Sequence, residues 1–228
     1  MTMVMLSDGR DKLCKVIQYG SRVLMAQSKA SNKESYLMYK TLFENFRDSR
    51  KIFRLLKFVN EIQTIMKSIG KNEDGDPVDQ VIFVASRVGF MLYWLFDNLL
   101  ILSKLKVLKS NSQTFMKPSM FFWWLGVTFT LARTLRRLQQ LKDTLLILND
   151  LSQKAPERKS EIDSNIKQTL GKMTTCFLII IKMFGDIIPS GAGWGLYDSM
   201  GFNVGDTEIG LGGLLSALVS VIEIYRRK

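Results

Sequence analysis

The chain ends in an almost uncharged apolar segment, and this feature limits its possible folds more than any other. Residues 209–225 carry a single charge, Glu223, and the basic residues Arg226, Arg227 and Lys228 follow immediately. A helix of this length reaches about 25 Å, which suffices to cross a bilayer that thins slightly or whose headgroups meet snorkelling side chains. The segment therefore predicts a C-terminal transmembrane helix, with a buried helix of a soluble bundle as the alternative.

Small residues recur on one face of this segment. Gly210 and Gly213 are followed four residues later by Ala217. Small side chains at such spacing let two helices approach closely inside a membrane. We therefore expect these three residues to mediate self-association, and we expect the protein to be a homo-oligomer.

Charge placement predicts the orientation of the chain. The basic C-terminus favours the cytosolic side, and residues 1–71 hold fourteen Lys or Arg against six Asp or Glu. Both termini should then be cytosolic, which requires an even number of crossings. The second span is either 81–102 or 172–188. The first of these contains Arg87 and Asp97, each costing about 2.5–3.5 kcal/mol near a bilayer centre, so it should be tilted, interfacial or shielded by protein.

The rest of the chain also indicates helices. Four prolines, at positions 77, 118, 156 and 189, are expected where elements end. The first helix should begin at Ser7 or Asp8, and turns or loops are expected at 28–34, 72–77, 153–160 and 191–195. The sequence thus predicts an all-α, membrane-associated protein with amphipathic helices. Its regions are a basic N-terminal one (1–72), a middle one (78–152) and a C-terminal one with the anchor (161–228).

A basic amphipathic pattern marks the second helix. Its apolar residues recur at steps of three and four, and its cations cluster on an arc of about 120° away from that stripe. Such a helix can lie in the headgroup plane with its cations on anionic lipid, although a bundle helix with a basic wet face has the same pattern. The expected membrane-binding residues are Ile52, Leu55, Val59, Ile62 and Met66 on the apolar side, and Arg47, Arg50, Lys51, Arg54 and Lys57 on the basic side.

Composition argues against catalysis and cofactor binding. Histidine is absent, and the two cysteines, Cys14 and Cys176, have no metal-ligand spacing. No phosphate-binding loop, nucleophile elbow or dinucleotide fingerprint occurs. We expect no enzyme activity, no cofactor and no metal. The net charge of +11 suits an anionic partner, and the apolar C-terminus favours membrane lipid over nucleic acid.

Four segments together resemble the peroxin 11 family of peroxisomal membrane proteins. The chain shows DGRDKLCKVIQYG at 8–20, RKIFRLLK at 50–57, YWLFDN at 93–98 before Ser103-Lys104, and GLGGLLSALVSVIEIYRRK at 210–228. These segments are similar to the family's N-terminal signature, amphipathic helix, mid-chain motif and C-terminal anchor, in that order. Residues 104–158 match the family pattern less closely, and nothing is carried over to them.

The resemblance implies a function at the peroxisomal membrane with both termini in the cytosol. Family members self-associate, elongate the organelle, and help recruit the dynamin-related GTPase and fission adaptors that divide it. A pore for small metabolites is the alternative that the family suggests, and Arg87 and Asp97 would then line its polar path. A soluble helical bundle that binds nucleic acid is the weakest of the three interpretations.

Overall fold

All regular structure in the described part of the chain is helical. A computed structural model describes residues 7–69 and 76–226, and the all-α prediction is confirmed for them. The elements are α1 (Ser7–Ser28), α2 (Lys33–Ile52), α3 (Lys57–Ser68), α4 (Pro77–Lys104), α5 (Gln113–Lys154), the 3-10 helix η2 (Pro156–Arg158), α6 (Lys159–Trp194), α7 (Leu196–Ser199) and α8 (Asp206–Arg226).

Side-chain caps define two of the helix starts. The Asn32 side chain accepts hydrogen bonds from the backbone N–H groups of Glu34 and Ser35 at the start of α2. Asp76 accepts one from Val78, and Pro77 occupies the first turn of α4, where its missing N–H removes no helical bond. Ser7, the first described residue, is already helical, and the predicted turn after the first helix is confirmed. Most of the predicted loop 72–77 lies outside the described residues, as do Arg227 and Lys228.

Two prolines do not end helices, which corrects the sequence prediction. Pro118 lies inside α5 and Pro189 inside α6. Long apolar helices tolerate proline because neighbouring groups satisfy the freed backbone. The predicted loop 191–195 is likewise wrong, since residues 191–194 complete α6 and only Gly195 turns, at a φ of 93°.

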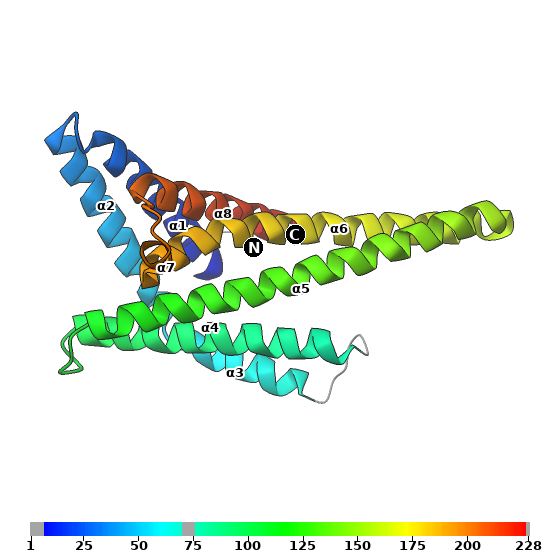
Figure 1. Ribbon diagram of the computed structural model, residues 1–228, viewed down its shortest axis with the longest axis horizontal. Helices are drawn as coiled ribbons and strands as arrows, with labels where there is room; N and C mark the ends of the chain where they lie inside the picture. Colours follow the sequence, from blue (N-terminus) through cyan, green and yellow to red (C-terminus); the bar gives the residue numbers. More distant parts are fainter. Residues whose placement is uncertain (1–6, 70–75, 227–228) are drawn as a thin grey trace.

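Antiparallel pairs of long helices form the body of the molecule. In Figure 1, α4 lies along α5, α5 and α6 extend together to one end where η2 joins them, and α8 lies along α6. Glycines allow two of these contacts: a Cβ on Gly89 would lie 2.8 Å from the Cα of Gly126, and one on Gly185 would lie 2.6 Å from the carbonyl oxygen of Gly212. The predicted linker around residues 153–160 is the tip of the α5–α6 pair.

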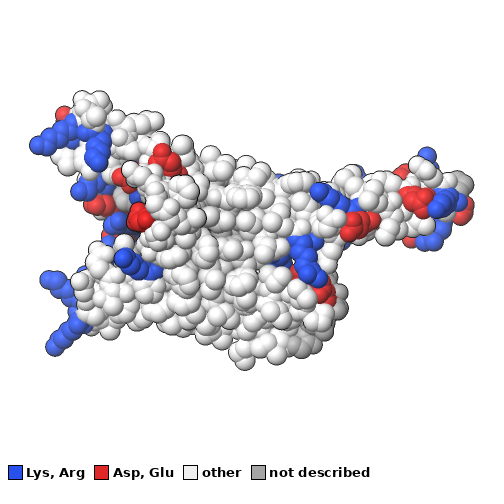
Figure 2. Space-filling model, in the orientation of Figure 1, with Lys and Arg blue, Asp and Glu red and all other residues white. Residues whose placement is uncertain are grey.

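Within the described residues, three helices are long and apolar enough to cross a bilayer: α4, α6 and α8. The expected C-terminal spanning helix and both candidates for its partner therefore meet this criterion. Outward-facing side chains on α8 are apolar, with Leu211, Leu215, Leu218 and Ile222 all exposed. Figure 2 shows charged residues gathered toward the two ends of the long axis, with a broad uncharged region between them. This distribution suits a protein whose middle contacts lipid.

Candidate functional site

The predicted second helix is divided in two. Helix α2 ends at Ile52, residues 53–56 form a turn, and α3 begins at Lys57. Leu56 has a φ of 61°, a left-handed conformation, and its backbone N–H donates to Asn98 Oδ1 on α4 at 2.9 Å. A single continuous amphipathic helix was therefore wrong. The turn redirects the chain, so the cations before it and the apolar residues after it face different surroundings.

Three of the five predicted membrane-binding cations point into the protein. Arg50, Lys51 and Arg54 are only 4%, 9% and 8% exposed. Arg50 Nε and Arg54 Nε lie 3.1 Å and 2.9 Å from one oxygen of Asp11 on α1, and Lys51 Nζ lies 3.1 Å from Asp97 on α4. The expectation that these cations face lipid headgroups is therefore corrected. The three cations turn inward because α1 and α4 supply the carboxylates that pair with them.

The other two cations lie at the edge of this cluster. Arg47 is paired with Asp48 at 3.3 Å, and Lys57 Nζ lies 2.7 Å from Asp8. Their side chains are 37% and 23% exposed, more than those of the three interior cations. These two positions remain able to meet a headgroup, whereas the interior three are not.

A second group of polar residues extends the cluster to the C-terminal helices. Lys15 on α1 donates to Asp186 Oδ1 on α6 and to Ser216 Oγ on α8, each at 2.7 Å. Sequence reasoning did not identify Lys15, Asp186 and Ser216 as functional residues, although Lys15 lies in the segment 8–20 that resembles the family's N-terminal signature. Only the contact across 171 residues identifies Asp186 as its partner. The cluster thus joins α1, α2, α4, α6 and α8.

Burial and pairing compete within the cluster. Burial alone would raise the pKa of Asp11, but Arg54 and Lys12 hold it below its ordinary value of 3.8. Burial lowers the pKa of Lys15, and the nearby Asp186 only partly offsets that effect. Asp11 is therefore firmly ionised at neutral pH, and it is the common partner of the cations around it.

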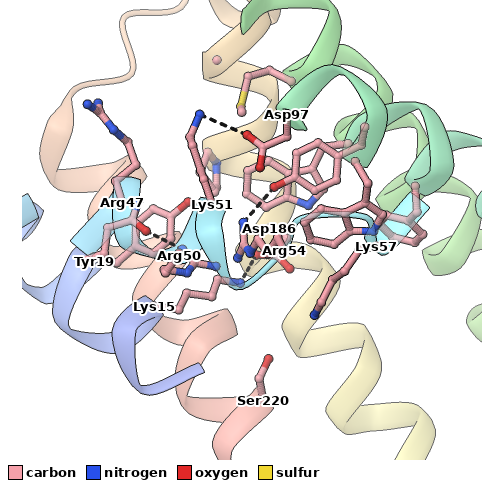
Figure 3. A pocket seen from close by; sticks show the side chains of 18 of the residues that line it. Lys15, Tyr19, Arg47, Arg50, Lys51, Arg54, Lys57, Asp97, Asp186 and Ser220 are labelled. Atoms are coloured by element: carbon pink, nitrogen blue, oxygen red, sulfur yellow. Dashed lines mark hydrogen bonds and ion pairs between the residues drawn. The ribbon is translucent and has the colours of Figure 1, made fainter. Parts of the chain in front are cut away.

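These groups surround a cavity of about 870 Å³. Figure 3 shows Lys15, Arg50, Lys51 and Arg54 around this space, with Asp97 opposite Lys51. Eleven lysines and arginines line the cavity, against four carboxylates. Arg87 and Asp97, the two charges within residues 81–102 of α4, both belong to its wall. Protein therefore shields them, as their cost in lipid requires.

The apolar residues after the turn lie on the outside. Val59, Ile62 and Met66 of α3 are 38%, 38% and 68% exposed, and helical spacing places them within one narrow arc. Ile52 and Leu55, on the other side of the turn, are also exposed. The opposite face of α3 packs on α4. The structure thus leaves the predicted apolar stripe uncovered, and its membrane contact stays a prediction.

The predicted self-association face is occupied within the chain itself. A Cβ on Gly213 would overlap the ring of Tyr19, and one on Gly210 would lie 2.7 Å from Cγ2 of Val23, both on α1. Ala217 is fully buried. The small residues do allow close helix approach, but the partner is α1, so their assignment to contacts between copies is corrected.

Among the described residues, no cluster of carboxylates and cysteines could hold a metal ion. The fold and site define a class: a helical membrane protein with several candidate spans, a basic cavity and an exposed apolar helix beside a candidate span.

Comparison with known proteins places the chain within this class. The family model for peroxisomal biogenesis factor 11 matches residues 1–225, and the chain belongs to that family. Peroxisomal membrane protein 11E of Arabidopsis thaliana is 27% identical, covering 80% of this chain and 73% of the relative. Peroxisomal membrane protein 11C of the same plant is 22% identical over 96% and 87%.

A fungal relative is also similar. Peroxisomal membrane protein PMP27 of Saccharomyces cerevisiae is 31% identical over 58% of this chain and 55% of its own. No solved structure is significantly similar to the chain. The expected family is thus confirmed, and the protein is a peroxisomal membrane protein of the family associated with peroxisome proliferation.

Proposed function

We propose that this protein promotes the elongation, proliferation and fission of peroxisomes by inserting α3 into the membrane, without catalysing a reaction. The observation that carries the proposal is the uncovered apolar face of α3, which packs on the candidate span α4. A helix inserted about 5–10 Å deep expands one leaflet relative to the other. That mismatch in area favours positive curvature, the curvature of a tubule.

The structure changes the proposed source of membrane affinity. With Arg50, Lys51 and Arg54 engaged inside the protein, the apolar side chains must supply most of the binding energy. Each large apolar side chain contributes about 1.5–3 kcal/mol when fully buried, whereas a cation near an anionic surface adds about 1 kcal/mol. Membrane bending should therefore depend less on anionic lipid than the sequence pattern alone suggests.

Both termini are proposed to be cytosolic. Along the α1–α8 contact, Lys15, Tyr19 and Val23 meet Ser216, Gly213 and Gly210 in turn, so the two helices are antiparallel. Ser7 and Arg226 therefore lie at the same end of this pair. The basic C-terminus supports the cytosolic side.

Partners of this function also remain proposals. They are anionic membrane lipids, further copies of the chain, and a dynamin-related GTPase with its fission adaptors, but no nucleic acid. Because α1 covers Gly210 and Gly213, contacts between copies would use other surfaces. The lipid-facing apolar side chains of α6 and α8 are available for this purpose.

The test compares two faces of α3 in the full chain reconstituted into vesicles. Ile62→Glu with Met66→Glu places two charges on the apolar face, and Asn60→Glu with Gln63→Glu places the same charges on the exposed polar face. We expect the first variant to lose tubules in electron micrographs while both retain wild-type thermal stability. Equal tubulation by all three proteins would refute insertion of α3.

The cavity favours a second candidate function, a pore for small metabolites. The observation that favours a pore is that Arg87 and Asp97, inside a candidate span, line the same polar space. Conductance of the reconstituted protein in planar bilayers, altered by Asp97→Asn, is the expected result. Absence of any conductance would remove this candidate and leave the membrane-bending proposal intact.

A further inference from the structure

The charges around the cavity do not balance. Asp11 is the partner of three cations, Lys12, Arg50 and Arg54, and Asp48 is shared by Arg47 and Lys104. The other lining cations each have one carboxylate. By the ion pairs of the described residues, eleven lining cations thus meet eight carboxylates, which leaves a surplus of three positive charges.

Two of the three surplus charges lie around the buried Asp11, and the third lies around Asp48, which is partly exposed with Arg47 and Lys104. Arg50 and Arg54, which share Asp11, are among the most buried charged residues of the described chain. Burying an ion without full compensation is strongly unfavourable, so a like-charged cluster of this kind is destabilising unless another anion joins it. Arg87 adds a second observation, because its buried Nε has no hydrogen-bond partner among the described residues.

The donors and the size of the cavity indicate what that anion is. Arginine presents planar N–H donors that match the oxygens of a phosphate, and lysine supplies a compact positive charge. A volume of about 870 Å³ is far larger than one water molecule needs and falls in the range of small-molecule sites. Tyr93 and Trp123, stacked at a centroid distance of 5.6 Å, both line the cavity and provide an aromatic wall.

We infer that this cavity binds a phosphate-bearing, multivalent anion, held by Arg50, Arg54 and Lys15. The phosphate has two possible sources, the headgroup of an anionic lipid that enters between the helices, or a soluble phosphate compound. Both present the same chemistry to the guanidinium groups. The inference concerns the cavity of the pore candidate but requires no conduction, so the failure of either can be recognised separately.

The design of a test follows from the shared carboxylates. Arg50→Gln leaves Asp11 with Arg54 and Lys12, and Lys104→Gln leaves Asp48 with Arg47. The double variant therefore removes two surplus charges without leaving a carboxylate unpaired. Arg137→Gln with Lys172→Gln is the matched control, because both residues are exposed and neither lines the cavity.

The full chain, purified in neutral detergent, is titrated with inorganic pyrophosphate, and its thermal unfolding is followed by tryptophan fluorescence. We expect a saturable rise in Tm for the wild type and the control, and an apparent affinity at least about tenfold weaker for the double variant, the loss expected for one charge-assisted hydrogen bond. If the double variant does not fold, Lys104→Gln alone, at a partly exposed site, should weaken binding by a smaller factor.

The lipid arm separates the two sources. Wild-type protein is compared in phosphatidylcholine nanodiscs with and without phosphatidic acid. A headgroup in the cavity would raise Tm in the acidic nanodiscs and abolish the response to pyrophosphate there, and a soluble ligand would leave that response in place. Either result supports the site. A wild type that responds to neither probe, or a double variant that responds as the control does, would overturn it.

Discussion

The two halves of the basic amphipathic segment, residues 47–54 and 57–69, have opposite surroundings in the folded chain. The first half directs Arg50, Lys51 and Arg54 into a cavity, and the second exposes Val59, Ile62 and Met66. A turn at residues 53–56 separates them. In one pattern that looked uniform, cations thus lie in the interior while apolar side chains remain outside. Basic residues beside an apolar stripe do not by themselves identify a lipid-facing surface.

Removing the carboxylate of Asp11, which Arg50 and Arg54 share, should cause the largest loss of stability among the changes that test this comparison. Asp11→Asn would leave Arg50 and Arg54 buried with no counter-charge, a loss of about 3–5 kcal/mol for a broken buried pair. We expect a marked drop in Tm in detergent, or failure to recover folded protein. Asp150→Asn is the control, because its pair with Lys154 is exposed and should contribute less than about 1 kcal/mol. Similar losses for both variants would mean that the interior cluster does not support the fold.

Lowering the pH should reveal the contribution of Asp11 to stability without a mutation. The folded pKa of Asp11 lies below its ordinary value of 3.8, so its contribution is fully present above that value and is lost as the pH falls through the folded pKa. Stability of the wild type should thus fall steeply below about pH 4. Asp11→Asn, measured by the same thermal unfolding, should show a shallower acid dependence. Parallel acid profiles would assign the loss to other carboxylates, such as Asp8 and Asp48, whose pKa values are also lowered.

The sequence predicted the helices better than it predicted their surroundings. Periodicity and length located the C-terminal span, because α8 has local signals throughout. The same reasoning failed at Leu56, where a hydrogen bond to Asn98, 42 residues away, stabilises the turn. It also failed for the interior cations, since the contact of Arg50 with Asp11 spans 39 residues. Contacts that distant are invisible to any local pattern.

The small-residue face of α8 allows a test that separates packing within the chain from packing between chains. Gly213→Ala would place a Cβ against the Tyr19 ring, and overpacking of this kind costs about 1–3 kcal/mol. Gly171→Ala on α6 meets nothing within 4 Å and should instead stabilise by about 0.5–1 kcal/mol, because alanine favours the helix. If Gly213→Ala changes the oligomeric state while Tm stays constant, the glycine face acts between copies.

The smallest expected change in stability comes from a substitution in the turn at residues 53–56. At this position, the sign of the change distinguishes a turn from a continuous helix. Leu56 is 64% exposed and left-handed, a conformation that costs a side-chain-bearing residue about 1–2 kcal/mol. Leu56→Gly removes that strain and keeps the backbone donor to Asn98, but it adds freedom to the unfolded chain. We expect a net gain of a few tenths of a kcal/mol up to about 1 kcal/mol in thermal unfolding.

An exposed leucine inside a regular helix is the control for that change. Leu146 of α5 is 68% exposed, and Leu146→Gly should cost about 1 kcal/mol because glycine weakens helix interiors. If residues 47–69 instead formed the continuous amphipathic helix that periodicity predicts, Leu56→Gly would cost as much as Leu146→Gly. Opposite signs for the two variants would establish the turn that directs the cations inward and leaves the apolar face of α3 exposed.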